Sequence, residues 1–206
     1  MSTRPLAVAI EAMMAKGVVF ESGLTVAEFA DIEKQFGFSF PPDLREFLSM
    51  GLPVSDDFPN WRTGKRKRGD REISIADLID WPLEGMCFDI ERNGFWIRDW
   101  GARPDDLQEA FKVAWKMVKE APTLIPVFSH RFLPAEPALD GNPVMSVYQT
   151  DIIYYGRDLT SYLANEFELP IKEQGNGNKE PRRIRFWSDI IERSDNIFYS
   201  DSNRSE

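Results

Sequence analysis

The stretch that decides the fold is residues 24–48, LTVAEFADIEKQFGFSFPPDLREFL, which predicts two consecutive helices. Thr25 and Glu28 have the spacing of a capping box, in which each side chain bonds the backbone of the other at a helix start. Gly37 can take the left-handed conformation that closes a helix. The FPPD run at 40–43 then begins a second helix, because proline is tolerated in the first turn and an acid is favoured at the positive end of the helix dipole.

Helical spacing of apolar residues predicts further helices elsewhere in the chain. They are a helix over 5–16 with Leu6, Ile10, Met13 and Met14 on one face; a helix over 104–119 with Leu107, Phe111, Ala114 and Val118; a helix capped by Asp158 with Leu159, Tyr162, Leu163 and Phe167; and a C-terminal helix with Ile184, Trp187, Ile190 and Ile191. Each is apolar along one face, as expected of a helix that covers a core.

The other regular segments are predicted to be β-strands. Residues 86–90 and 95–100 are short apolar runs around Asn93-Gly94, and Asn-Gly is the strongest short hairpin signal because both residues tolerate a positive φ. Residues 124–132 and 144–155 are rich in β-branched and aromatic residues and predict strands. The expected fold is therefore α+β, a single domain with a largely antiparallel β-sheet packed against several α-helices.

The chain is predicted to divide near residue 170. Residues 1–170 would form the α+β domain, including the N-terminal helix. Residues 171–206 would form a flexible joint around the run QGNGN at 174–178, followed by a C-terminal helical tail that docks back on the domain.

Composition excludes several classes of protein. The 206 residues suit one domain, and no apolar run approaches the roughly 18 residues that a membrane span needs. The single cysteine, Cys87, has no partner for an internal disulfide, and together with the single histidine, His130, it cannot supply a four-ligand His/Cys zinc site. Glu11 interrupts the apolar run near the N-terminus, which favours a core helix over a signal peptide. We therefore expect a cytoplasmic protein that binds no membrane and no metal.

The charge balance indicates what kind of partner to expect. With 25 Lys and Arg against 34 Asp and Glu, the net charge is −9, which repels nucleic acid and attracts basic partners. Residues 62–71, RTGKRKRGDR, oppose this balance with six basic groups and one acid. Because like charges repel, this segment is expected to be a solvated, mobile surface loop, with a partner-contact arm as the alternative.

The sequence contains no recognisable catalytic motif. A nucleophile needs an activating base, and no local signature pairs His130 with Cys87 or with a serine. Cys87 is expected to be a small buried hydrophobe, and His130 a structural, hydrogen-bonded residue. No phosphate-binding loop of the form GxxxxGK[ST] is present, so nucleotide chemistry and cofactors are not expected. Aromatic residues in the strand runs could stack on sugars or bases, although in strands they more often belong to the core.

Residues 32–48 resemble the N-terminal signature of the SUKH superfamily, which couples a helix ending at a glycine to an aromatic-Pro-x-Asp start of the next helix and then to a Phe-Leu pair. Further motifs are similar to one bacterial branch of that superfamily. They are FDI at 88–90, FW at 95–96, WG at 100–101, IP at 125–126, HRF at 130–132, Pro134, GNP at 141–143, SVY at 146–148 and DIIYYG at 151–156. The resemblance extends over residues 24–167.

The resemblance implies an α+β domain that works by binding. Many bacterial members of the superfamily are immunity proteins that neutralise toxins of polymorphic or contact-dependent systems, and fungal relatives regulate cell-wall synthesis through protein contacts. The motif residues with structural roles would be Glu33, Gly37, Pro41, Asp43, Phe47, Trp96, Asn142 and Pro143. The segment 62–71 and the tail after 170 depart from the family pattern, and they leave the partner open.

From the resemblance and the acidic charge, we expect a non-enzymatic immunity protein whose partner is a toxin domain encoded nearby. The candidates for the partner surface are Trp100, His130, Arg131, Tyr148, Asp151 and Tyr155. The alternative is a small-ligand sensor for sugars or nucleotides, or an intracellular regulatory scaffold, and an enzyme comes third. The oligomeric state stays open.

Overall fold

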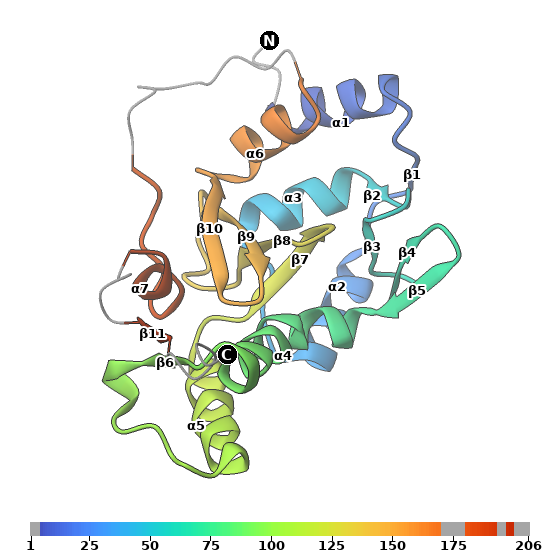
Figure 1. The fold of residues 1–206 in the computed structure, drawn as a ribbon. Coiled ribbons are helices and arrows are strands. Elements are labelled where there is room, and N and C mark those ends of the chain that lie inside the picture. The colour runs from blue at the N-terminus through green and yellow to red at the C-terminus, as the bar shows by residue number, and fades with distance from the viewer. Residues whose placement is uncertain (1–4, 170–179, 193–196, 200–206) are drawn as a thin grey trace.

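The computed structural model describes residues 5–169, 180–192 and 197–199. It is an α+β domain in which a four-stranded antiparallel sheet, in the order β10-β9-β8-β7, lies among helices (Figure 1). The elements are α1 (Pro5–Ala15), β1 (Phe20–Glu21), α2 (Val26–Phe36), α3 (Pro42–Met50), β2 (Leu52–Pro53), β3 (Pro59–Asn60), β4 (Lys65–Arg68), β5 (Arg71–Ser74), α4 (Ile75–Arg92), β6 (Phe95–Ile97), a 3-10 turn (Arg98–Trp100), α5 (Leu107–Glu120), β7 (Leu124–Phe128), β8 (Arg131–Pro134), β9 (Val144–Tyr148), β10 (Asp151–Gly156), α6 (Leu159–Glu166), α7 (Trp187–Glu192) and β11 (Ile197–Tyr199). None of the helices in these ranges has the length and apolar character needed to cross a membrane.

The sheet separates two hydrophobic cores. Successive residues of a strand point to opposite faces, so Leu133 of β8 joins the first core and its neighbour Phe132 joins the second. The first core is covered mainly by α1, α2, α3 and α6, and includes Phe47 and Tyr162. The second core is covered mainly by α4, α5, β6 and α7, and includes Trp187.

The stretch 24–51 folds as predicted. The Thr25 hydroxyl accepts from Glu28 N at 3.3 Å, and the Glu28 carboxylate accepts from Thr25 N at 2.8 Å, which completes the capping box of α2. Gly37 closes this helix in the left-handed region with a φ of 72°. The next helix, α3, begins at Pro42.

Aromatic rings fill the space between α2 and α3. Phe38 and Phe40 meet edge-to-face at 5.1 Å, and both pack on Trp61. The Glu33 carboxylate accepts from Phe40 N at 2.9 Å and from the Arg45 guanidinium at 2.8 Å. The hydrogen bond to Phe40 N, the Glu33–Arg45 ion pair and the packed rings thus fix the orientation of α3 relative to α2.

The predicted strand over 86–90 is wrong, because these residues belong to the long helix α4. Ser74 caps this helix, and its buried residues recur at helical spacing. Pro82 lies inside it, where proline normally interrupts a helix, and this hides the length of α4 in the sequence. Asn93 N donates to Asp89 O at 2.9 Å, so the Asn-Gly pair follows a helix end and does not turn a hairpin. The strand that was expected to complete this hairpin, β6, pairs with β11 instead.

The two long strands predicted over 124–132 and 144–155 each fold as a hairpin, β7–β8 and β9–β10. Two-residue turns join the strands, and each turn contains a residue in the left-handed region, Ser129 with a φ of 48° and Gln149 with a φ of 56°. Side chains other than glycine rarely take that conformation, so the composition carries no turn signal at either position.

Helix ends agree with the predictions in part. Asp158 caps α6 as predicted. α5 begins at Leu107 with Asp106 as its cap, and not at Pro104. Met14, predicted on the buried face of α1, is exposed.

The C-terminal segment 180–192 packs on the domain. Ile184 and Trp187 are buried in the second core, although α7 begins at Trp187 and so is shorter than predicted. The predicted joint at 174–178 and the division at 170 lie outside the described residues.

The segment 62–71 is largely exposed as predicted, but it is not a loop: it contributes β4 and the start of β5, which form a three-stranded sheet with β3. Its alternative role as a partner-contact arm stays a prediction. Lys65 and Lys67 both pair with Glu72 on the facing strand, at 2.7 and 3.3 Å. Cross-strand carboxylates of this kind offset the repulsion between the cations.

Two arginines tie the hairpin region to the rest of the domain. Arg62 Nε lies 2.6 Å from the Glu28 carboxylate on α2, and its Nη1 lies 3.0 Å from Glu21. Arg66 Nη1 donates to Ser129 O at 2.5 Å, in the turn between β7 and β8. The Arg62 guanidinium, with help from the amide of the capping box, lowers the pKa of Glu28 from 4.5 to about 2.

Replacing Gly37 with Val should lower the free energy of unfolding by about 1–2 kcal/mol, because a β-branched residue is strained at this positive φ. Nothing beyond the adjacent residues lies within 4 Å of the position that a Cβ would take, so the cost is conformational. Urea unfolding is the measurement. Gly37→Asn, a residue that tolerates the left-handed region, is the control and should cost clearly less; equal losses for the two variants would contradict this explanation.

Replacing Arg62 with Met should lower the urea midpoint at neutral pH, and the difference from wild type should shrink as the pH falls from about 4.5 towards 2. The pKa of Glu28 is depressed in the folded state, so the stability it contributes is complete above the unfolded value and is lost as the carboxylate is protonated. Lys112→Met removes a cation from an exposed pair on α5 and is the control. A difference for Arg62→Met that stays constant down to pH 2 would show that the ion pair is not its source.

Candidate binding face

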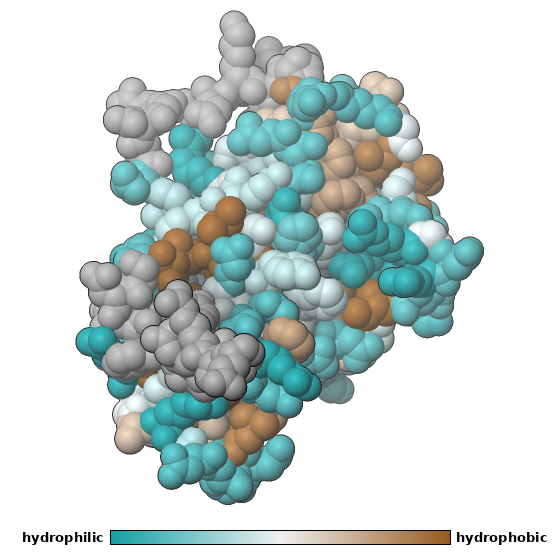
Figure 2. Space-filling view, viewed as in Figure 1, coloured by the Kyte–Doolittle hydropathy of each residue, from teal (hydrophilic) through white to brown (hydrophobic). Residues whose placement is uncertain are grey.

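Large apolar side chains are exposed on β9, β10 and α4. Phe88 is 47% exposed, Tyr148 60%, Ile153 49% and Tyr155 37%. We call these residues, with Asp151, the outer face. Residues 151, 153 and 155 alternate with buried or half-buried neighbours along β10, and Tyr148 is the register partner of Asp151. Figure 2 shows hydrophobic side chains gathered over β10 on the side that faces the viewer.

A groove adjoins the outer face between α4 and the turn that links β9 to β10. Its volume is about 290 Å³. Its lining comprises Trp81, Glu84, Gly85, Phe88, Tyr148 and Gln149. The first four share one side of α4, because they follow the i, i+3, i+4, i+7 spacing of a helix. We call this the α4 groove.

Gly85 lets the turn approach the backbone of α4. A Cβ at this position would lie 2.7 Å from Cα of Gln149 and 3.2 Å from its N, closer than side chains come to backbone atoms. The floor of the groove is therefore formed by two backbones in direct contact.

A buried carboxylate holds the same turn in place. Asp89 is 4% exposed, and its Oδ2 accepts from Thr150 N at 2.9 Å and from Thr150 Oγ1 at 2.5 Å. Its Oδ1 accepts from Asn93 Nδ2 at 2.6 Å. Hydrogen bonds to a charged acceptor are the stronger kind, so the groove exists before any partner arrives.

The Arg131 side chain packs on the ring of Tyr155. Arg131 was expected to be exposed as a partner-surface residue, and this expectation is wrong. Its side chain is 11% exposed, with Cζ 3.6 Å from the centroid of the Tyr155 ring. Nε lies 3.6 Å from Glu166, and Nη1 donates to Ser146 Oγ at 3.0 Å. Burial, with the Glu166 charge, raises the pKa of the adjoining Tyr162 well above its usual range. Arg131 thus packs on an exposed ring and is itself largely buried.

Trp100 also departs from its expected place. It packs against Trp96 at 5.1 Å and against Phe186 at 6.4 Å, at the edge of the second core. It is half-buried there and is not part of the outer face.

His130 lies half-buried in the turn between β7 and β8, with Nδ1 3.2 Å from Ser129 Oγ. Burial and the guanidiniums of Arg131 and Arg66 lower its pKa, so the imidazole is neutral at neutral pH. It lines neither the α4 groove nor the cavity described below.

Cys87, predicted to be buried, is half-buried on α4. Burial, together with Glu84, raises the pKa of its thiol, so the proton stays on sulfur at neutral pH. Reactive cysteines have the opposite shift.

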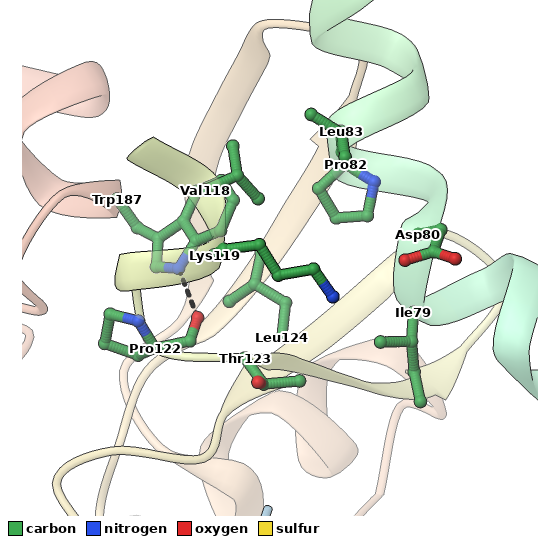
Figure 3. Close-up of a pocket in the computed structure, with 10 residues that line it drawn as sticks. All are labelled: Ile79, Asp80, Pro82, Leu83, Val118, Lys119, Pro122, Thr123, Leu124 and Trp187. Carbon is green, nitrogen blue, oxygen red and sulfur yellow. Dashed lines mark hydrogen bonds between the residues drawn. The ribbon is translucent and has the colours of Figure 1, made fainter. Parts of the chain in front are cut away.

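A smaller cavity of about 70 Å³ lies where α4, α5, β7 and α7 meet (Figure 3). Trp187 closes one wall, and its Nε1 donates to Pro122 O at 2.7 Å. The Lys119 side chain extends towards the side on which Asp80 lies. The space would hold a few water molecules and is a gap in packing under α7.

The motif residues behind the family resemblance occupy structural positions. Asp43 accepts from Gly141 N at 3.0 Å, and burial raises its pKa. Asn142 is fully buried and donates to the carbonyl oxygens of Pro134 and Pro137. The remainder are Glu33, which bonds Phe40 N; Gly37 and Pro41, at the end of α2 and the start of α3; Phe47 and Trp96, buried in the cores; and Pro143, buried before β9.

The sequence candidates Tyr148, Asp151 and Tyr155 lie on the outer face, but Trp81 and Phe88 were not among the candidates. Reading residues 86–90 as a strand placed Phe88 in the sheet. The signal that could have found both is the seven-residue interval between the two aromatics, which is two turns of a helix.

Over residues 5–169, 180–192 and 197–199, no three His, Cys, Asp or Glu side chains are grouped as a metal site requires. No family model matches the chain, and no curated protein or solved structure matches it. The outer face and the α4 groove therefore carry the functional interpretation.

Replacing Gly85 with Ala should destabilise the protein by about 1–3 kcal/mol in urea unfolding, because the new methyl group would push the β9–β10 turn away from α4. In an unobstructed helix the same change stabilises by about 0.5–1 kcal/mol, so the sign of the effect is diagnostic. Ala76→Gly, at an exposed position of α4, calibrates the helix propensity on this helix. Stabilisation by Gly85→Ala would mean that the close approach is not present.

Proposed function

We propose that this chain is a non-enzymatic protein-binding domain that neutralises a toxin, as SUKH immunity proteins do. The outer face is the observation that carries the proposal. Exposed apolar side chains grouped on one surface mark interaction sites more often than scattered ones do. Binding energy in protein interfaces is concentrated in aromatic side chains such as Tyr148.

The rigidity of this face supports the proposal. Asp89 fixes the β9–β10 turn to α4. The Arg131 guanidinium packs directly on the Tyr155 ring and so holds it in place. A surface that is already ordered loses less conformational entropy when a partner binds.

The charge of the chain supports a basic partner. The net charge is −9, and the cations of the basic segment are largely engaged within the domain, Lys65 and Lys67 with Glu72 and Arg62 with Glu28. A basic toxin domain, such as a nuclease with a basic cleft, would be attracted to such a protein.

A sugar sensor is the second candidate, because three aromatic side chains line the α4 groove. The described lining holds the acid Glu84 and no Lys or Arg, which disfavours a nucleotide phosphate. A regulatory scaffold would use the same outer face with another partner.

The direct test is co-expression of the full chain with the C-terminal toxin domain encoded beside it. A stoichiometric complex and rescued growth are the expected results. A toxin that stays free and lethal in the presence of the folded protein would overturn the immunity proposal.

Replacing Tyr148 or Phe88 with Ala should weaken the binding of that toxin domain by about tenfold or more, which is about 1.4 kcal/mol. Both side chains are already exposed, so the free protein should stay folded. Trp115→Ala on α5 is the matched control, since the exposure of this side chain, 54%, lies between those of Phe88 and Tyr148 and it is not part of the outer face. Calorimetric titration measures the affinities, and a loss for Trp115→Ala alone would place the interface elsewhere.

A further inference from the structure

We propose that the α4 groove receives an arginine side chain of the protein partner, stacked on the aromatic walls and paired with Glu84. This inference rests on the proposed protein-binding function and names the chemistry of the partner at one site.

The walls of the groove suit a planar cation. Trp81 and Phe88 stand on one side, from α4, and Tyr148 on the other, from β9. The face of an aromatic ring attracts a cation, and the flat guanidinium of arginine also stacks on it. Two arginines of the described residues already make this contact, with Arg131 Cζ 3.6 Å from the centroid of the Tyr155 ring and Arg45 Cζ 4.4 Å from that of Phe29.

The charge of the groove is complementary to the same group. Among the described residues of the lining, Glu84 alone is charged, and Asp151 is the register partner of Tyr148 at the edge of the groove. Within the described residues, neither carboxylate takes part in an ion pair. The groove thus combines three aromatic rings with the carboxylate of Glu84, which is the chemistry that binds a guanidinium.

The size of the groove favours a side chain as its occupant. About 290 Å³ is at the lower limit of pockets that hold a whole small ligand. Gly85 and Asp89 fix its floor, so an inserted side chain would meet a formed slot.

The experiment uses the full chain and a defined probe, the peptide acetyl-Gly-Arg-Gly-amide. The indole N–H resonance of Trp81, assigned from a Trp81→Phe variant, is followed by NMR during titration. A saturable shift with a dissociation constant of roughly 1–10 mM is expected. Glu84→Gln should weaken binding by about threefold or more. Glu91→Gln removes the same charge from α4 outside the groove and should have little effect.

Several results would overturn the arginine site. They are no saturable shift with the arginine peptide, an equal shift with acetyl-Gly-Ala-Gly-amide, or an equal loss of binding for Glu91→Gln and Glu84→Gln. A preference for glucose or N-acetylglucosamine over the peptide would assign the groove to a sugar. If the toxin domain binds wild type and Glu84→Gln equally, the arginine site is wrong while the protein-binding function stands.

Discussion

The four-stranded sheet must be covered on both faces, and the arrangement of the domain follows from that constraint. Phe132 and Leu133 are adjacent in β8 and are both fully buried, one in each core. Burying a side chain of this size contributes about 1.5–3 kcal/mol, so neither face of the sheet can be left open without a large loss. Helices from the N-terminal half, from the middle and from the C-terminal segment are all recruited to meet the requirement.

The outer face lies where this cover ends. Near the β9–β10 turn the outward residues of the hairpin, Tyr148, Asp151 and Ile153, are exposed. The turn is nevertheless held firmly, because Asp89 binds Thr150 from inside the protein and Gly85 admits the turn to the surface of α4. An exposed apolar surface that is already ordered loses less conformational entropy when a partner binds.

Local signals in the sequence were sufficient for the elements that local interactions determine. The capping box at Thr25 and the left-handed Gly37 are properties of a few neighbouring residues, and both were predicted. The burial of Arg131 depends on Tyr155 and Glu166, whose positions only the folded chain defines.

The incorrect prediction of a strand over 86–90 also has a physical cause. Pro82 lies inside α4 and the Asn93-Gly94 pair follows its end, so a signal that usually breaks a helix lies on each side of the stretch 86–90. Packing against the sheet overrides the proline, whereas the Asn-Gly pair ends the helix and does not turn a hairpin. Without α4, the sequence could not place Phe88 on the outer face or predict the four α4 residues of the groove, although it could predict Tyr148, Asp151 and Tyr155 as partner-surface candidates.

Hydroxyl-radical footprinting of the complex with the neighbouring toxin domain tests the central claim most directly, because it reports the exposure of individual side chains. The account predicts that Phe88 and Tyr148 lose reactivity in the complex while Trp115 on α5 reacts as in the free protein. Protection of Trp115 with unchanged reactivity at Phe88 and Tyr148 would contradict it.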